Sequence, residues 1–124
     1  MAKTILIVDD SATMLMSVKA TLVMGGFNVE TAADGLLALN KLKEGLKPDL
    51  IITDINMPNM GGMELIKNVR TLPALRFTPI LALTTESQAD SRDAAKKLGA
   101  TGWLVKPCIG PQLIAAIKQV LPGA

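Results

Sequence analysis

The sequence predicts an α/β protein with a doubly wound (βα)5 arrangement, in which five strands alternate with five helices. Short apolar runs rich in β-branched residues alternate with longer segments of helical periodicity. The runs Ile5–Val8 and Leu50–Thr53 are apolar almost throughout, which is typical of strands buried on both faces. This alternation implies a parallel sheet with helices on both faces, joined by right-handed crossovers.

Each expected element has its own start and stop signals. Ser11 and Asp34 are suitable N-caps for the first two helices, and Leu36, Leu39 and Leu42 are expected on the inner side of the second. The expected strands are Ile5–Val8, Phe27–Thr31, Leu50–Thr53, Pro79–Leu83 and Gly102–Val105. The expected helices are Ser11–Met24, Asp34–Glu44, Gly62–Arg70, Ser87–Leu98 and Pro111–Leu121.

The length and composition disfavour several classes of protein, including membrane-spanning, secreted and nucleic-acid-binding proteins. A chain of 124 residues without a linker is expected to form one domain over residues 1–124, with no output domain. No apolar run reaches the roughly 18 residues of a membrane span, and the N-terminus has no secretion signal. The single cysteine, Cys108, allows no internal disulfide and agrees with a cytoplasmic location. A net charge of +2 is too small to predict nucleic-acid binding.

Polar residues gather where the predicted strands end. Asp9 and Asp10 follow the first strand, Asp54 the third, Thr84 the fourth and Lys106 the fifth. The carboxyl ends of parallel strands meet at one edge of the sheet, where α/β proteins bind ligands. Each residue alone has a commoner role as a helix cap, a turn residue or a solvated side chain. Their joint occurrence predicts a site.

Three neighbouring carboxylates need a cation or a proton. Two unit charges about 4 Å apart repel by about 4 kcal/mol at an effective dielectric constant of 20. Oxygen ligands without nearby histidine or cysteine favour Mg²⁺. With Mg²⁺ bound, Asp54 can act as a nucleophile toward a phosphoryl group, while Lys106 and Thr84 contact the phosphoryl oxygens.

The sequence contains, in this order, the segments ILIVDDSATM, LIITDINMPNMGGMEL, ILALTTE and WLVKP. Together they resemble the receiver domains of bacterial two-component response regulators, over nearly the whole chain, and among these the CheY-like chemotaxis regulators. The resemblance implies a flavodoxin-like sheet of five parallel strands in the order 2-1-3-4-5, the order known for flavodoxin and CheY.

The resemblance also implies a role for each residue at the strand ends. Asp54 is implied to be the phosphoacceptor. Asp10 and Asp54 are implied to bind Mg²⁺ through their carboxylates, Asp9 through water, and Asn56 through its backbone carbonyl. Lys106 is implied to pair with the phosphoryl group.

Two further positions are implied to form the switch. The hydroxyl of Thr84 would be drawn toward the phosphoryl group, and the aromatic residue Trp103 would fill the space it leaves. The family usually has Tyr or Phe at the position of Trp103, and Ala or Gly at that of Thr85. The bond between Lys106 and Pro107 is expected to be cis.

The implied partners are a histidine kinase of the CheA type and an effector that binds the face of the fourth helix, fifth strand and fifth helix. A flagellar motor switch protein of the FliM type is the expected effector, and the protein is expected to be a monomer. A phosphate sink or phosphorelay intermediate stays open as an alternative. An aspartyl-phosphate hydrolase is disfavoured because Asn56 stands where such an enzyme needs a carboxylic acid, so no turnover on external substrates is expected. A nucleotide binder is disfavoured because no glycine-rich phosphate loop follows a strand.

Overall fold

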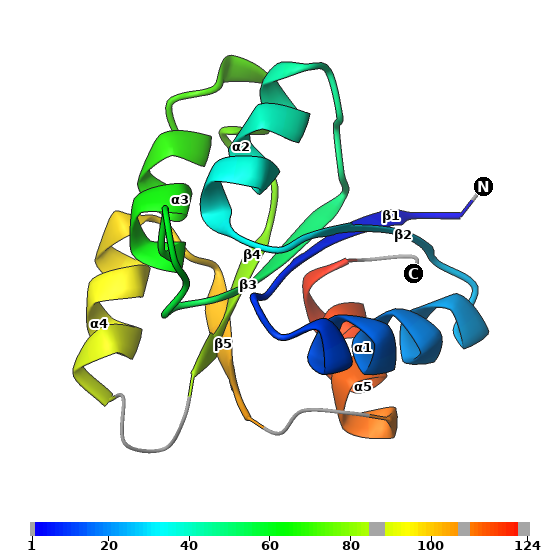
Figure 1. Cartoon of the computed structure of the whole chain (residues 1–124). Helices are drawn as coiled ribbons and strands as arrows, with labels where there is room; N and C mark the ends of the chain where they lie inside the picture. Colours follow the sequence, from blue (N-terminus) through cyan, green and yellow to red (C-terminus); the bar gives the residue numbers. More distant parts are fainter. Residues whose placement is uncertain (1, 85–88, 107–109, 122–124) are drawn as a thin grey trace.

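The computed structural model describes residues 2–84, 89–106 and 110–121. They form a five-stranded parallel sheet in the order β2-β1-β3-β4-β5, with helices on both faces (Figure 1). The predicted fold class and strand order are therefore confirmed. The order reverses between β1 and β3, which makes the gap beyond their carboxyl ends the topological switch point of the sheet.

The elements lie close to their predicted positions. The strands are β1 (Thr4–Val8), β2 (Asn28–Ala32), β3 (Leu50–Asp54), β4 (Ile80–Thr84) and β5 (Gly102–Val105). The helices are α1 (Ala12–Met24), α2 (Gly35–Lys43), α3 (Gly62–Val69), α4 (Ala89–Leu98) and α5 (Pro111–Val120), with a short 3₁₀ helix, η1, at Pro73–Leu75 that the sequence did not predict. None of the helices in the described ranges combines the length and apolar character needed to cross a bilayer.

Two strands begin one residue later than predicted. The N–H of Phe27 donates to Leu22 O and completes the end of α1, so β2 begins at Asn28, whose N–H donates to Lys3 O. Pro79 has no N–H to give to the ladder, and β4 begins at Ile80. Strands β3 and β4 also extend one residue beyond their predicted ends, so Asp54 and Thr84 are the last residues of their strands rather than the first residues after them.

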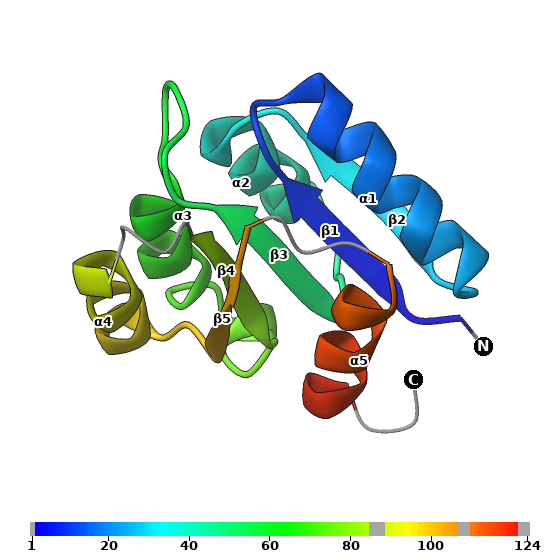
Figure 2. The ribbon, with the colours of Figure 1, turned by 90° about the horizontal axis from the view of Figure 1, so that it is seen from below.

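The sheet separates two apolar layers, which Figures 1 and 2 show from two directions. One layer packs β-strand side chains such as Leu6 and Ile51 against α2, α3 and α4. The other packs side chains such as Ile7 and Ile52 against α1 and α5. The central strands β3 and β4 are buried along their whole length, whereas the edge strand β5 alternates between half-buried and exposed residues and runs between α4 and α5 in both views.

The predicted inner side of α2 is partly wrong. Leu39 and Leu42 are buried, but Leu36 is 44% exposed, and Ala38 takes the inward position instead. The rotation of the helix is fixed at its start, where the N–H of Gly35 donates to Met60 O at 2.9 Å. A Cβ at Gly35 would lie 2.5 Å from the same carbonyl oxygen, so only glycine allows this approach.

Candidate metal centre

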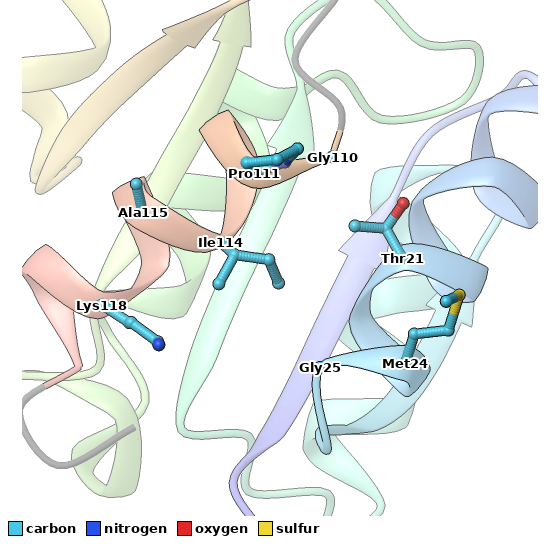
Figure 3. Close-up of a pocket in the computed structure, with 8 residues that line it drawn as sticks. All are labelled: Thr21, Met24, Gly25, Gly110, Pro111, Ile114, Ala115 and Lys118. Atoms are coloured by element: carbon cyan, nitrogen blue, oxygen red, sulfur yellow. The ribbon is translucent and has the colours of Figure 1, made fainter.

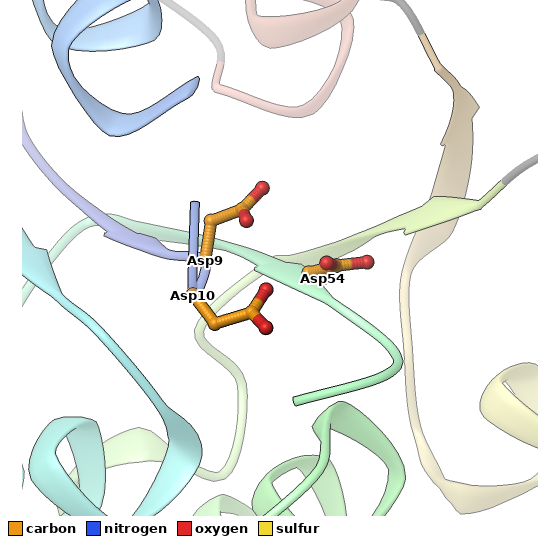
Figure 4. A group of neighbouring side chains, drawn as sticks. All are labelled: Asp9, Asp10 and Asp54. Carbon is orange, nitrogen blue, oxygen red and sulfur yellow. The ribbon is translucent and has the colours of Figure 1, made fainter. Parts of the chain in front are cut away.

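Three carboxylates meet at the switch point of the sheet. Asp9 directly follows β1, Asp10 comes next, and Asp54 ends β3. The two strands are neighbours with Val8 opposite Thr53, so Asp9 and Asp54 come side by side. One carboxylate oxygen of each of the three residues lies within 4.8 Å of the others, and Figure 4 shows the side chains standing beyond the strand ends.

Lys106, which follows β5, completes the cluster with a positive charge. Its Nζ lies 2.9 Å from Asp54 Oδ2 and 3.5 Å from Asp9 Oδ2. The other oxygen of Asp54, Oδ1, accepts a hydrogen bond from the N–H of Ile55 at 2.8 Å. Both oxygens of Asp54 are therefore held, which fixes the orientation of the buried carboxylate.

Asp9 is the most deeply buried of the three carboxylates in the cluster. Its Oδ1 accepts a hydrogen bond from the N–H of Ser11 at 2.9 Å. Its Oδ2 is buried and accepts no hydrogen bond within the described part of the chain, although the Lys106 ammonium is near. Burial raises the pKa of the Asp9 carboxyl above its ordinary value, against the opposing effects of the Ser11 N–H and the Lys106 charge.

The pKa of Lys106 reflects both its burial and its carboxylate neighbours. Burial alone would lower the pKa of Lys106, but the hydrogen bond to Asp54 and the charges of Asp54 and Asp9 outweigh burial and raise it. The ammonium therefore stays charged at neutral pH. A single positive charge facing three carboxylates still leaves the cluster short of cations.

The residues present fit a hard divalent cation. All donors in the cluster are carboxylate oxygens, one of them buried without a hydrogen bond, and Asp10 is exposed on the solvent side. Mg²⁺ prefers this combination of a few carboxylates with remaining positions for water. The donor set therefore matches the Mg²⁺ site that the sequence predicted.

The predicted switch residues lie on the neighbouring strands. Thr84 is fully buried at the end of β4, where its carbonyl accepts a hydrogen bond from the N–H of Lys106 at 2.7 Å and its hydroxyl lies 3.5 Å from Leu104 O. Ala82 pairs with Trp103 and faces the α4 layer. Because side chains alternate along strands, Thr84 and Trp103 share that face.

Trp103 is 39% exposed, and its ring lies under the Lys96 ammonium of α4, 5.9 Å from the ring centroid. This contact joins β5 to α4 directly. Four residues about which the sequence made specific predictions lie outside the described residues: Thr85, Ser87, Pro107 and Cys108.

The loop of residues 55–61, between β3 and α3, carries Asn56, whose side chain is exposed. Gly62 closes this loop, since its N–H donates to Ile55 O at 2.8 Å. A Cβ at Gly62 would lie 2.1 Å from Asp54 O, so the start of α3 packs against the end of β3 more closely than any other residue permits. Glycine at position 62 thus holds the loop against the acidic cluster.

One group near the site was not predicted from the sequence. Asp34, expected only as the cap of α2, also accepts a hydrogen bond from the amide of Asn59 at 2.8 Å. Asn59 has a φ of 64°, which asparagine adopts more readily than most residues. The Pro58-Asn59-Met60-Gly61 sequence signals such a turn, but its partner could not be read from the sequence.

A separate groove of about 580 Å³ lies between α1 and α5 (Figure 3). Its walls carry one charged side chain, Lys118, and apolar side chains such as Met24 and Ile114. It contains no carboxylate and is lined by none of the acidic cluster, so it is not the metal centre.

Comparison with known proteins agrees with this geometry. The family model described as "Response regulator receiver domain" matches residues 5–118. The chain is a response regulator receiver domain. Among curated proteins, the receiver domain is 37% identical over 117 residues to the transcriptional regulatory protein PrrA of Mycobacterium tuberculosis, a match that covers 94% of this chain and 49% of PrrA. The receiver domain spans about half the length of the curated relatives it matches.

Solved structures also match the receiver domain over nearly its whole length. The chemotaxis response regulator CheY4 of Vibrio cholerae is 45% identical, with a TM-score of 0.91 over 98% of this chain and 100% of CheY4. The receiver domain of sensor histidine kinase PA1611 from Pseudomonas aeruginosa is 26% identical, with a TM-score of 0.87 over 96% of this chain and 97% of that one. That structure has a magnesium ion coordinated in the active site cleft.

Proposed function

We propose that this receiver domain is a phosphorylation-activated switch in which Asp54 accepts a phosphoryl group from a histidine kinase. The observation that supports this most strongly is the convergence of three carboxylates from β1 and β3 beside the ammonium of Lys106, whose Nζ lies 2.9 Å from Asp54 Oδ2. Neither a helix cap nor a structural ion pair needs three carboxylates, two of them buried, gathered at one place.

The proposed chemistry is phosphoryl transfer to a carboxylate. An oxygen of Asp54 forms a bond to phosphorus as the bond between phosphorus and the histidine nitrogen of the donor breaks, and the product is an acyl phosphate. The N–H of Ile55 and the ammonium of Lys106 hold the carboxylate in place beforehand. Lys106 then neutralises an oxygen of the transferred group.

Mg²⁺ would be held by the carboxylates of Asp10 and Asp54, by Asp9 through water and by the backbone carbonyl of Asn56. When bound there, it would neutralise the carboxylates and the oxygens of the phosphoryl group. The magnesium found in the PA1611 receiver domain supports this assignment.

We propose that phosphorylation shifts the population of two arrangements at β4, β5 and α4. Thr84 and Trp103 lie on the same face of adjacent strands, one at the rim of the acidic cluster and one against Lys96 of α4. A movement of Thr84 toward the phosphoryl group would therefore change the packing under Trp103. The affected surface is the α4–β5–α5 face.

The proposed partners are a kinase of the CheA type and a flagellar motor switch protein of the FliM type, which the protein would meet as a monomer in the cytoplasm. Similarity to the chemotaxis regulator CheY4 over its whole chain supports the chemotaxis role. A phosphate sink or relay is the second candidate, because both roles need the same acidic cluster. In each case the only acyl phosphate formed and lost is the protein's own.

Intact-mass measurement after treatment with a small acyl-phosphate donor tests the proposed chemistry. We expect the mass of one phosphoryl group to be added in the presence of Mg²⁺ and to be absent with a chelator or in Asp54→Asn. Binding of the phosphorylated form to a motor-switch peptide then separates the two roles. An equal affinity before and after phosphorylation would contradict the chemotaxis output.

The variant Lys106→Ala tests whether phosphorylation can occur without the gain in affinity for the partner. Phosphorylation should remain largely possible, because the nucleophile and the metal ligands stay, but the gain in partner affinity should disappear. The two readouts are the added mass and the peptide affinity, measured on the same sample.

A further inference from the structure

Two hydrogen bonds fasten the start of α2 to the loop that follows β3. The amide of Asn59 donates to Asp34 Oδ2 at 2.8 Å, and the N–H of Gly35 donates to Met60 O at 2.9 Å. These four residues, called the clasp below, join segments from different parts of the chain. None of them belongs to the acidic cluster.

The clasp uses residues that few others could replace. Asn59 is the one non-glycine residue with a positive φ among those described, and its side chain is the donor of the bond. Gly35 lies so close to Met60 O that a Cβ would be 2.5 Å away. The two hydrogen bonds of the clasp therefore depend on an asparagine in the left-handed conformation and on a sterically required glycine. Together they fix the tip of the loop.

The base of the same loop is fixed at β3. The N–H of Ile55 donates to Asp54 Oδ1, and the N–H of Gly62 donates to Ile55 O, each at 2.8 Å. Asn56 lies between the fixed base and the clasped tip. The exposed segment that carries its carbonyl is thus held at both ends rather than free in solvent.

We infer that the clasp positions the Asn56 carbonyl for Mg²⁺, which makes Asp34 and Asn59 positioning residues of the metal centre. The inference rests on the proposed function, in which that carbonyl is a ligand. Mg²⁺ demands a nearly ideal octahedral arrangement, so a loop free to move would bind it less well. The clasp removes this freedom before the ion arrives.

A purely structural role would give a different result. Asp34 also caps α2, since its Oδ1 accepts the N–H of Leu37 at 2.8 Å. If the clasp only stabilised the fold, its loss would lower the free energy of unfolding without changing the affinity for Mg²⁺. The affinity is therefore the quantity to measure.

Asn59→Gly tests the inference directly, because glycine keeps the positive φ and removes only the amide. Calorimetric titration with Mg²⁺ should show a dissociation constant about tenfold higher than that of the unaltered protein.

A reversed clasp provides the rescue. In the double variant Asp34→Asn/Asn59→Asp, the donor and acceptor exchange places, the net charge is unchanged, and the amide oxygen at position 34 can still cap α2. We expect this variant to recover most of the affinity for Mg²⁺ that Asn59→Gly loses.

Asp49→Ala is the matched control. Asp49 Oδ2 accepts the backbone N–H of Thr4 at 2.8 Å, a hydrogen bond to a carboxylate of the same length as that of the clasp, but at the opposite end of β3 from the acidic cluster. Its loss should lower stability and leave Mg²⁺ affinity unchanged. The inference would be overturned if Asn59→Gly bound Mg²⁺ as tightly as the unaltered protein. It would also be overturned if Asn59→Gly and Asp49→Ala lost the same amount of Mg²⁺ affinity. Either result would leave the proposed function standing. Absence of Mg²⁺ binding by the unaltered protein would overturn both.

Discussion

Strand β3 has a carboxylate at each end, and the two ends behave differently. Asp49 precedes the strand and accepts one hydrogen bond, from the N–H of Thr4. Asp54 ends the strand beside Asp9 and Asp10, and it is held by Ile55 and Lys106. The first carboxylate joins two segments; the second accumulates charge that those contacts do not fully neutralise. Under the proposed function, the reactive carboxylate is therefore distinguished by the charges around it rather than by its place at a strand end.

The largest expected difference between the two ends is chemical. Asp54→Asn should abolish addition of a phosphoryl group, because an amide is no nucleophile for phosphorus, whereas Asp49→Asn should be phosphorylated at the rate of the unaltered protein. Mass measurement over time with an acyl-phosphate donor checks both. Phosphorylation of Asp54→Asn at another residue would show that the comparison selects the wrong carboxylate.

The next largest effect is a loss of stability when the close packing of Gly62 against the Asp54 end of β3 is disturbed. In Gly62→Ala, the added Cβ would lie 2.1 Å from Asp54 O, a backbone atom that cannot move aside cheaply. We expect a loss of about 3 kcal/mol in the free energy of unfolding, measured by urea denaturation. Gly102→Ala is the control, since its Cβ would make an ordinary contact of 3.5 Å with Leu81. A similar loss in the two variants would contradict the argument.

Removing the ammonium should expose the excess of negative charge. Lys106→Met is expected to lose about 2 kcal/mol of stability without Mg²⁺, since the buried Asp9 carboxylate keeps no cationic neighbour in the cluster. Saturating Mg²⁺ should stabilise this variant more than it stabilises the unaltered protein. Thermal unfolding with and without Mg²⁺ measures both quantities.

Lys41→Met is the control for that measurement, because Lys41 pairs with Glu30 at 3.6 Å and the two side chains are 40% and 49% exposed, more than that of Lys106. Its stability should not depend on Mg²⁺ more than that of the unaltered protein. An equal response of the two lysine variants to Mg²⁺ would mean that the ion does not replace the Lys106 charge.

The smallest expected effect concerns acid stability at the clasp. The N–H of Leu37 and the amide of Asn59 lower the pKa of Asp34 below its ordinary value of 3.8. A carboxyl whose folded pKa is lowered stabilises the fold above its unfolded pKa, and this contribution is lost as the pH falls through the folded pKa.

Asp34→Ala should therefore lose less stability than the unaltered protein as the pH falls from neutral into the acid range. Urea denaturation at each pH measures the difference, and Asn28→Ala, which removes no carboxylate, should keep the slope of the unaltered protein. Parallel curves for Asp34→Ala and the unaltered protein would contradict the effect.

The sequence predicted the features that follow from periodicity and topology. Apolar runs and caps gave the elements, and the parallel sheet brought Asp9 and Asp54 to one edge. The rotation of α2, which exposes Leu36, depends on the approach of Gly35 to Met60. Hydrogen bonds of this kind between distant loops follow from the packed structure and leave no periodic signal.

Arg70 illustrates the same limit. It was predicted only as the last residue of the third helix, and in the structure it is the residue that directly follows α3. Its guanidinium donates to four backbone carbonyls, from Gly99 beyond α4 and from the segment around η1, at Leu75, Arg76 and Thr78. A sequence shows that an arginine ends a helix, but not which carbonyls the fold brings within its reach.

Calorimetric titration with Mg²⁺, of the unphosphorylated protein and of Asp10→Asn, tests most directly whether the three carboxylates form a metal centre. Asp10 is the exposed member of the cluster, so its replacement should leave the fold intact while removing one ligand. Binding of one Mg²⁺ by the unaltered protein and at least about tenfold weaker binding by Asp10→Asn is the predicted result. No binding by the unaltered protein, or equal binding by the two, would mean that the three carboxylates do not form a metal centre.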